Sequence, residues 1–505
     1  REVQEVNLKA TLRYLKDITP NFGIDILVGG NQQRNFDETI SGGGSNFNVP
    51  FLHTVKNLAN QSVGYGFSKF QVNSAFGAAE FSFFNSLYVT ATGRLDVFST
   101  LTDPNGAESE NSIFYPSVGV AYDLGEGLDL PGFIDLAKVR AAWAQVGGAT
   151  DPYRLGLTYG IFGQGHLGNP LGGVSSGSIP PAGLVPSTNQ EFEVGLDLFM
   201  YAGRVHVDFA YYNRTTTDGI LSAAVSPTSG FGSKVVNVGE ISNNGVELLL
   251  DVSPVKQGDF RWDLGFNVSH NVNEVVSLLT PEADDEQIRL QESRTRNAYI
   301  HLVEGLPYSQ VMGFQYARDA SGNIQLDDDG LPVQGELMPF GTGVHPTSLG
   351  INNAIRWRDL TFSFLIDVKT GAKIYNATNA YGYFRGLHRA TLEGRETGLG
   401  AVPAEDVENY YQRIAFGISE EFIDDADFAK LREVILSYNI PRDLTSKIGV
   451  QGASLSFAAR NLAVLWRKTD NIDPESTYTS GNGQGLEMFG VPVARSYGLN
   501  LNVKF

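Results

Sequence analysis

The stretch "EFEVGLDLFMYAGRVHVDFAYYNR" at residues 191–214 decides the fold, because apolar side chains occupy every second position on both sides of a short turn. Before "YAG" they fall at the even positions from Phe192 to Met200, and after it at the odd positions from Val205 to Tyr211. This period of two is that of a β-strand, and the short connection predicts a tight antiparallel hairpin. Charged residues on the opposite face are too frequent for a dry core, so one face meets apolar material and the other meets water.

The same alternation recurs along the chain, for example in "RWDLGFNVS" at 261–269 and "LTFSFLIDV" at 360–368. It predicts about fifteen strands by the period-two criterion. They are expected near residues 5–16, 22–35, 66–80, 86–100, 113–124, 136–147, 190–200, 204–216, 238–252, 259–273, 347–357, 360–370, 427–440, 450–462 and 494–505.

The connections alternate between short turns such as "DITPN" at 17–21 and long segments. An outer-membrane barrel has short periplasmic turns and long outer loops, whereas propellers and sandwiches have no reason to keep that rhythm. We therefore favour an all-β, transmembrane antiparallel β-barrel of the bacterial outer membrane over a soluble all-β protein. Residues 1–505 are expected to form one barrel portion, with long extracellular loops near 36–65, 148–189, 217–237, 274–346, 371–426 and 463–493.

The number of expected strands is odd, whereas a complete bacterial barrel has an even number and both ends in the periplasm. If the last strand ends in the periplasm, the first strand at Arg1 starts from an extracellular loop. We therefore expect an odd number of strands to precede this stretch, which makes it the C-terminal part of a barrel.

Composition excludes several classes of protein. The net charge is −19 and no block of Lys or Arg stands out, so nucleic acid is not an expected partner. The chain has no cysteine, which excludes a disulfide scaffold and thiolate metal sites. No stretch approaches the roughly 18 consecutive apolar residues of a membrane helix, a test that alternating barrel strands escape.

Several stretches together resemble the C-terminal barrel portion of the SusC/RagA family, the TonB-linked outer-membrane transporters of Bacteroidetes-type bacteria. In chain order they are "IFYPSVGVAYDL" (113–124), "VRAAWAQVGG" (139–148), "EFEVGLDLF" (191–199), "YYNRTTTDGIL" (211–221), "NVGEISNNGVELLLDVSP" (237–254), "VEGLPYSQVMGFQY" (303–316), "GINNAIRWRDLTFSFLIDVKTGAKIYN" (350–376), "GRE" (394–396), "LREVILSYNIP" (431–441), "ARNLAVLWRKTDNIDPES" (459–476) and the terminal "GVPVARSYGLNLNVKF". No one of them is diagnostic, but together in this order they are specific.

The resemblance implies a 22-stranded barrel of which this chain supplies the last strands, with a plug domain and a TonB-contacting segment upstream. It implies energy-dependent import of a large nutrient, an oligosaccharide or a peptide, delivered by a SusD-like surface lipoprotein that caps the barrel. Pairing of two transporter–lipoprotein units is also common in the family. The alternatives are a structural or docking barrel of a larger outer-membrane assembly, and a siderophore-type receptor of the same fold.

The stretch "NAYGYFRGLHRATLEGRE" at 379–396 is the candidate for substrate contact. It places aromatic faces and planar donors in an expected extracellular loop, and such groups suit sugar rings. The candidate ligand-binding residues are Tyr381, Tyr383, Phe384, Arg385 and His388. The competing interpretation is that they pack on the lipoprotein or support the loop.

Neither a metal nor another cofactor is expected. The seven histidines, at 53, 166, 206, 270, 301, 345 and 388, show no i, i+4 pair in a helical pattern, and alternation places His206 on the water-facing side of its strand. The acidic runs "RDASGNIQLDDDGLP" (318–332) and "PEADDEQ" (281–287) lack the spacing of a calcium loop, so we favour solvated loops. No nucleophile elbow or phosphate-binding loop is present, and the chain is not expected to be an enzyme.

The chain ends in "SYGLNLNVKF" at 496–505, which alternates up to the terminal aromatic residue. We expect it to be the closing strand of the barrel, paired with the strand near 450–462. Its apolar face should meet outer-membrane lipid, and the terminal aromatic residue fits the signal read by the barrel-assembly machinery. The residues of this signal are Tyr497, Leu499, Leu501, Val503 and Phe505.

Overall fold

The computed structural model describes residues 1–102, 111–164, 167, 169–181, 184–278, 287–478, 480–481 and 483–505. These residues form two compact units. The first consists of Arg1–Ala121, Ala142–Glu191 and Thr216–Val238, and the second of Tyr122–Ala141, Phe192–Thr215 and Gly239–Phe505.

In the first unit, consecutive long strands pair antiparallel. They are β1 (Glu2–Thr19), β2 (Phe22–Phe47), β3 (Leu58–Phe83), β4 (Leu87–Phe98) and β5 (Ser112–Asp123). A separate hairpin is formed by β7 (Tyr159–Gln164) and β8 (Pro170–Val174), and the short β9 (Ser178–Ile179) pairs parallel with the start of β12 (Ser233–Gln257). The 3-10 helices of this unit are η1 (Val55–Asn57), η2 (Ser99–Leu101) and η4 (Pro227–Ser229).

Like β5 and β12, three further strands have residues in both units: β6 (Ile134–Gly148), β10 (Ser187–Met200) and β11 (Val205–Ala224). In the second unit, the end of β12 pairs with the first of six strands that follow one another antiparallel. They are β13 (Phe260–Ser277), β18 (Thr347–Trp357), β19 (Leu360–Thr370), β22 (Phe428–Ile440), β23 (Gly452–Arg467) and β25 (Ser496–Lys504). The expected pairing of the C-terminal strand is confirmed, since Gly452 lies opposite Lys504 and Arg460 opposite Ser496.

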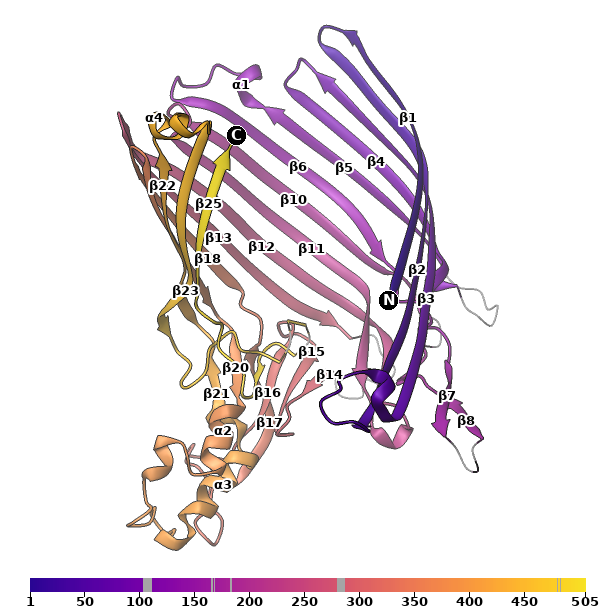
Figure 1. Ribbon diagram of the computed structural model, residues 1–505, viewed down its shortest axis with the longest axis vertical. Coiled ribbons are helices and arrows are strands. Elements are labelled where there is room, and N and C mark those ends of the chain that lie inside the picture. Colours follow the sequence, from indigo (N-terminus) through magenta and orange to yellow (C-terminus); the bar gives the residue numbers. More distant parts are fainter. Residues whose placement is uncertain are drawn as a thin grey trace. The chain divides into compact units, whose positions relative to one another are not determined.

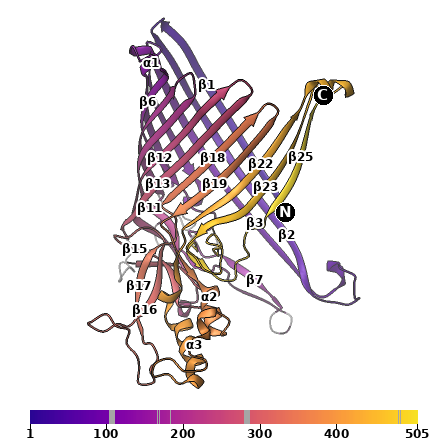
Figure 2. The same ribbon diagram turned by 90° about the vertical axis from the view of Figure 1, so that its left-hand side faces the viewer.

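The long connections of the second unit contain their own structure, which Figures 1 and 2 show at one end of its strands, opposite the short helix α4 (Arg442–Thr445). One connection folds as the antiparallel sheet β14 (Gln287–Glu292), β15 (Ala298–Val303), β16 (Gln310–Tyr316) and β17 (Gln334–Thr342). The others supply β20 (Lys373–Asn376), β21 (Ile423–Asp425), β24 (Leu486–Glu487), α2 (Ala377–Phe384) and α3 (Val407–Gly417). The remaining short elements are α1 (Leu124–Gly127), η5 (Arg389–Leu392), η6 (Ala404–Asp406), η7 (Ser419–Phe422) and η8 (Ser446–Ile448).

Two of the dry cores lie in the connections and where the connections meet the ends of the long strands. One cluster joins Leu331, Val402, Val407 and Tyr411 in the second unit, and another joins Leu101, Leu184 and Val235 in the first. By contrast, the apolar faces of the long strands stay open, as expected for strands that face lipid on one side. The described helices include none that is both long and apolar enough to cross a membrane.

The expected all-β antiparallel architecture is confirmed, and each of the expected strands corresponds to one of the long strands. Two expected loops are wrong in extent. The loop placed at 36–65 is mostly strand, because β2 continues to Phe47 and β3 begins at Leu58, and the one placed at 217–237 is shortened in the same way. The reason is that the backbones of β2 and β3 stay paired through this range, although its Gly- and Ser-rich sequence shows no alternation.

Candidate functional site

The candidate site lies in the connection between β19 and β22, where α2 follows directly from β20. Asn376 is fully buried, and its side chain caps α2 by accepting a hydrogen bond of 2.9 Å from the backbone NH of Asn379. The same side chain donates to Asp424 Oδ2 and to the carbonyl oxygen of Asp470, both at 3.0 Å. One residue thus fixes α2 to β21 and to the connection that follows β23.

Two of the candidate residues share a face of α2. Tyr381 and Phe384 are three residues apart, and their rings lie 5.6 Å and 4.6 Å from that of Phe416 on α3. Phe489, from the connection between β23 and β25, lies 5.3 Å from Tyr381. These two side chains therefore belong to a half-buried aromatic cluster, in which Phe416 is 38% and Phe489 56% exposed.

Tyr383 points to a second aromatic cluster. Its ring lies 4.9 Å from those of His388 and Phe422 and 5.6 Å from that of Tyr411. Burial and the neighbouring carboxylate of Glu421 raise the pKa of Tyr383 well above its ordinary value, so its hydroxyl stays protonated and donates to Glu421 Oε1 at 3.4 Å. Tyr383 and His388 thus also support the loop.

Arg385 differs from the other four candidate residues. Its side chain is exposed, with the guanidinium carbon 4.7 Å from the centre of the Phe384 ring. Within the described residues it forms no ion pair and no side-chain hydrogen bond. Of the five candidates, Arg385 is therefore the one that offers an exposed charged group with binding capacity to spare.

A cavity of about 440 Å³ opens beside Arg385 and Tyr383. Its wall carries a second guanidinium, that of Arg395, which already donates to the carbonyl oxygen of Thr391 at 2.6 Å. The lining also includes Glu405, Glu408 and Tyr411, so the cavity offers a free cation, carboxylates and an aromatic ring. Such a mixture suits hydroxyl-rich or peptide ligands, with no group placed for covalent chemistry.

The neighbouring connections are joined to this loop by buried hydrogen bonds. Tyr375 is fully buried, and its hydroxyl lies 3.0 Å from Thr295 Oγ1 and 2.9 Å from Asn297 Oδ1, both in the connection between β13 and β18. Thr378 donates at 2.8 Å to Glu487, which is 1% exposed and comes from the connection after β23. The three long connections of the second unit therefore form one folded body.

A cluster of ion pairs ties this body to the strands. Lys430 on β22 is 5% exposed and lies 2.5 Å from Asp473 and 2.6 Å from Glu475. Arg432, two residues along the strand, contacts Glu475 and Asp367 at 2.6 Å each. Burial favours the neutral acid, but hydrogen bonds from Arg432 and Lys430 and their positive charges lower the pKa of Glu475 to about 2.

Sequence reasoning missed this cluster. The sequence offers one signal of the cluster, which is a matching spacing of opposite charges. Lys430 lies two positions before Arg432 in "AKLRE", and Asp473 lies two positions before Glu475 in "IDPES". Nothing in the sequence alone shows that the two segments meet.

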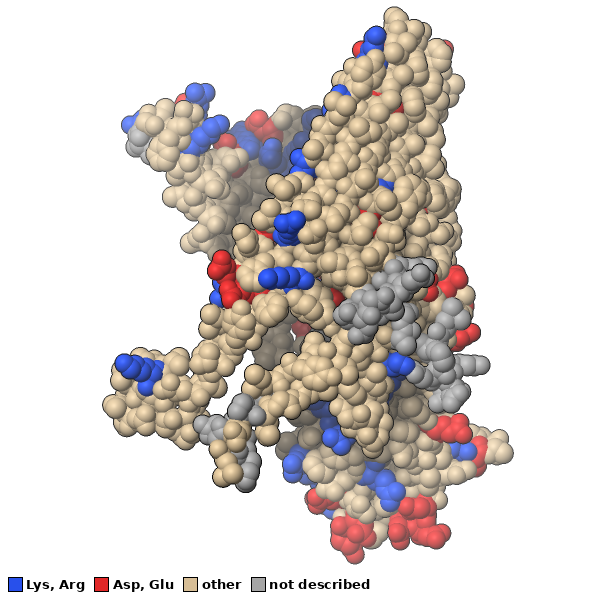
Figure 3. Space-filling view, turned by 90° about the vertical axis from the view of Figure 1, so that its right-hand side faces the viewer, with Lys and Arg blue, Asp and Glu red and all other residues tan. Residues whose placement is uncertain are grey.

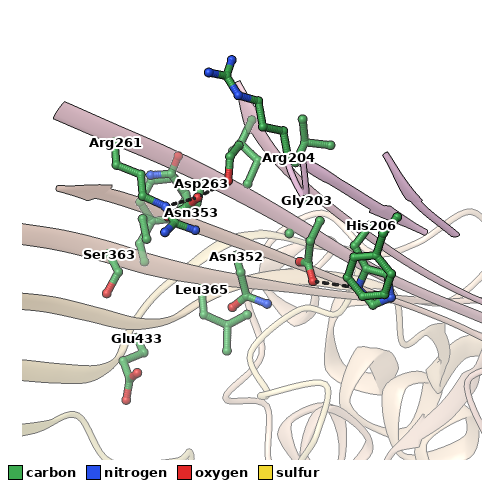
Figure 4. Close-up of a pocket in the computed structure, with 18 residues that line it drawn as sticks. Gly203, Arg204, His206, Arg261, Asp263, Asn352, Asn353, Ser363, Leu365 and Glu433 are labelled. Atoms are coloured by element: carbon green, nitrogen blue, oxygen red, sulfur yellow. Dashed lines mark hydrogen bonds and ion pairs between the residues drawn. The ribbon is translucent and has the colours of Figure 1, made fainter. Parts of the chain in front are cut away.

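A second cavity, of about 560 Å³, lies on the polar face of the second unit's strands and is shown in Figure 4. His206 stacks on Phe199 at 4.0 Å, and its Nε2 lies 3.0 Å from an Asp197 carboxylate oxygen. Across the cavity, Arg261 donates to Asp263 at 2.8 Å. The expected polar-face position of His206 agrees with these neighbours, and His206 and Arg261 are both already paired with carboxylates.

The acidic run at 318–332 forms turns. Asp319 accepts hydrogen bonds from the backbone NH of Ser321 and Asn323, and Asp327 accepts from those of Asp329 and Leu331. The acidic residues of the run at 281–287 lie outside the described residues, as does His166. In the part of the chain that is described, no three His, Asp or Glu side chains gather as a metal site.

The predicted assembly signal lies on β25, which pairs only with β23 among the described strands. Its five apolar residues share one face and are all exposed, from 40% for Val503 to 84% for Phe505. The Tyr497 ring stacks on that of Phe457 at 6.3 Å. Their role in assembly stays a prediction.

Comparison with known proteins identifies the family of the chain. The family model described as TonB dependent receptor-like, beta-barrel matches residues 5–462. TonB-dependent receptor P26 of Formosa agariphila is 26% identical over 550 aligned positions, which cover 100% of this chain and 54% of the relative. TonB-dependent receptor SusC of Bacteroides thetaiotaomicron is 23% identical and is matched over 98% of this chain and 49% of its own length.

Solved structures share the fold. The RagAB peptide importer in its "closed-closed" state superposes with a TM-score of 0.80 at 18% identity, over 99% of this chain and 55% of the other. The chain thus spans about half the length of the relatives it matches. These matches confirm the resemblance to SusC and RagA that the sequence indicated, and the outer membrane as its location. The family consists of transporters rather than enzymes, and this chain belongs to it, as a β-barrel of the TonB-dependent receptor-like family.

Proposed function

We propose that this chain forms part of the barrel of a TonB-dependent importer for a large nutrient, an oligosaccharide or a peptide, delivered by a SusD-like surface lipoprotein. The observation that carries the proposal is the folded body made by the three long connections of the second unit. A passive pore has no need for connections held together by buried groups such as Tyr375 and Asn376. A surface that receives cargo from a partner requires such fixed geometry.

In this proposal the long connections face outward and the short turns face the periplasm, as in other outer-membrane barrels. The exposed Arg385 and the adjoining 440 Å³ cavity supply contacts to cargo, while Tyr381, Tyr383, Phe384 and His388 hold the loop in shape. Arginine forms paired hydrogen bonds with carboxylates and vicinal hydroxyls, so both cargo classes fit. In this proposal, TonB acts through a plug domain of the whole protein.

The test is isolation of the full-length protein from native outer membranes through a tag on this chain. We expect a surface lipoprotein to copurify in near-equal amount, and mass spectrometry to find an oligosaccharide or peptide in the complex. A ferric chelate as the bound molecule would support a siderophore receptor instead. Isolation without a lipoprotein or cargo, together with stable larger assemblies, would support the docking-barrel alternative.

A further inference from the structure

One face of the first unit changes from apolar to basic along its strands. On β2 this face carries Val28 and Gly30, followed by Gln32, Arg34 and Phe36 at every second position. The stretch from Phe22 to Gln32 has the length of about 9–11 residues that a tilted membrane strand needs. Arg34 and Phe36 therefore lie just beyond the apolar band, on the side of the long connections.

Two cations meet at that level. Arg34 is paired in register with Gln71 and donates to its Oε1 at 2.9 Å, while Lys69 is paired with Phe36 and its Nζ lies 4.9 Å from the centre of that ring. Phe67 lies 5.9 Å from the same Nζ. A cavity of about 570 Å³ lies between these side chains and is bounded by Val6, Arg34, Phe36, Lys69, Gln71 and Ser99.

Neither cation is neutralised. Both side chains are exposed, and no carboxylate among the described residues forms an ion pair with Arg34 or Lys69. Glu38, the next acidic residue along this face of β2, is paired in register with Phe67 and forms no ion pair with either cation among the described residues. The chain has a net charge of −19, so two neighbouring cations that form no ion pair with a carboxylate stand out from its charge balance. An anionic ligand between them would explain this arrangement.

A shallow, open apolar groove adjoins the cavity toward the middle of the strands. It is bounded mainly by Leu12, Val28, Gly30, Gly77, Leu95 and Phe114. Between groove and cations lies a neutral pair, in which Gln32 donates to Asn73 at 2.9 Å. From Gly30 to Arg34 the strand advances about 13 Å at about 3.3 Å per residue. A ligand with an anionic headgroup and an acyl chain can therefore occupy the cavity and the groove at once. Figure 3, which looks at the side of Figure 1 where β2 and β3 lie, shows a strand surface that is mostly uncharged.

We propose that this face holds a phosphorylated lipid of the outer leaflet, with its phosphate between Arg34 and Lys69 and an acyl chain in the apolar groove. Charge-assisted hydrogen bonds from a guanidinium and an ammonium are the groups that bind phosphate most strongly. Phe36 and Phe67 lie at the level where aromatic residues border the membrane. The lipid would brace β1–β3 at the level where they leave the membrane.

The test uses the full-length protein in phosphatidylcholine nanodiscs, titrated with lipid A, the phosphorylated lipid of the outer leaflet, and followed by native mass spectrometry. The variants are Arg34→Gln, Lys69→Gln and their combination. The matched control is Lys16→Gln, an exposed lysine on the same face at the other end of β1. Retained heat modifiability on gels shows that each variant barrel is folded.

We expect each of Arg34→Gln and Lys69→Gln to weaken lipid A binding about fivefold, and the control to leave it unchanged. Dephosphorylated lipid A should bind equally weakly to every variant. Equal lipid A binding by the double variant and the parent protein would overturn the proposal.

Two further measurements distinguish binding of the headgroup from binding of the acyl chain. Gly77→Val places a side chain in the groove, where an added Cβ meets its nearest atom at 3.6 Å, and should weaken lipid A binding while inorganic phosphate binding stays the same. If inorganic phosphate displaces bound lipid A as effectively as unlabelled lipid A does, the site binds free phosphate, and the lipid assignment is refuted.

Discussion

Replacing Glu475 with Gln should release the connection between β23 and β25 from the strands. Glu475 contacts Lys430 and Arg432, and its side chain is 22% exposed. Its pKa falls from 4.5 to about 2, and this difference corresponds to about 3 kcal/mol favouring the ionised form in the folded protein. Gln keeps the shape but loses the charge, so up to that amount of local stability is lost.

The assay is amide hydrogen exchange of the full-length protein, read in peptides that cover 468–478. A loss of about 3 kcal/mol corresponds to about 100-fold faster exchange through local opening. The matched control is Glu433→Gln, since Glu433 pairs with an Arg460 that is 64% exposed and a surface pair contributes about 0–1 kcal/mol. Exchange in these peptides that is the same for Glu475→Gln and the parent would refute the reasoning.

The pH dependence has a definite sign. Because the folded-state pKa of Glu475 is lowered, its contribution is present above the unfolded value of about 4.5 and is lost as the pH falls toward 2. In the parent protein, the protection factors of the amides in 468–478, corrected for the intrinsic pH dependence of exchange, should therefore fall over that window, whereas those of Glu475→Gln should change less.

Three further predictions concern other parts of the chain. Deleting Phe505, which is 84% exposed at the end of β25, should lower the amount of protein in the outer membrane more than the thermal stability of assembled barrels; normal surface levels would count against the assembly signal. Arg385→Ala should weaken cargo binding without changing the protease resistance of the loop. Phe384→Ala loses the packing on Phe416 and should increase cleavage of 377–417. The reverse pattern would refute the assignment of Arg385. Burial raises the pKa of Asp424 to about 6; a hydrogen bond from Asn376 opposes this shift, and the charges of Asp470 and Asp425 reinforce it. Stability around β21 should therefore fall as the pH rises from about 4 to 6. Asp424→Asn should slow hydrogen exchange around β21 at pH 7.5, and faster exchange would contradict this sign.

The long strands could be predicted because lipid on one side and water on the other impose a period of two. β18 and β19 run over 347–357 and 360–370, the ranges that the alternation indicates. Past the membrane this constraint ends, and Gly and Ser at 41–45 hide the continuation of β2 even though its backbone stays paired.

The position of the candidate residues in a long connection could be predicted, whereas their packing partners could not, and their part in ligand binding stays a prediction. The aromatic residues near 381–388 do lie in a long connection, but their partners Phe416, Phe422 and Phe489 are distant in sequence. Whether an aromatic side chain packs inward or stays open depends on such contacts, which periodicity does not reveal. The exposed Arg385 could be separated from its neighbours only by the fold.

The most direct test of the importer is uptake by cells that carry the full-length protein and its lipoprotein, with the polymer that copurifies with them as labelled cargo. We expect uptake that stops when TonB is deleted or the proton gradient is collapsed, and that falls in Arg385→Ala. Uptake that continues unchanged without TonB would contradict it.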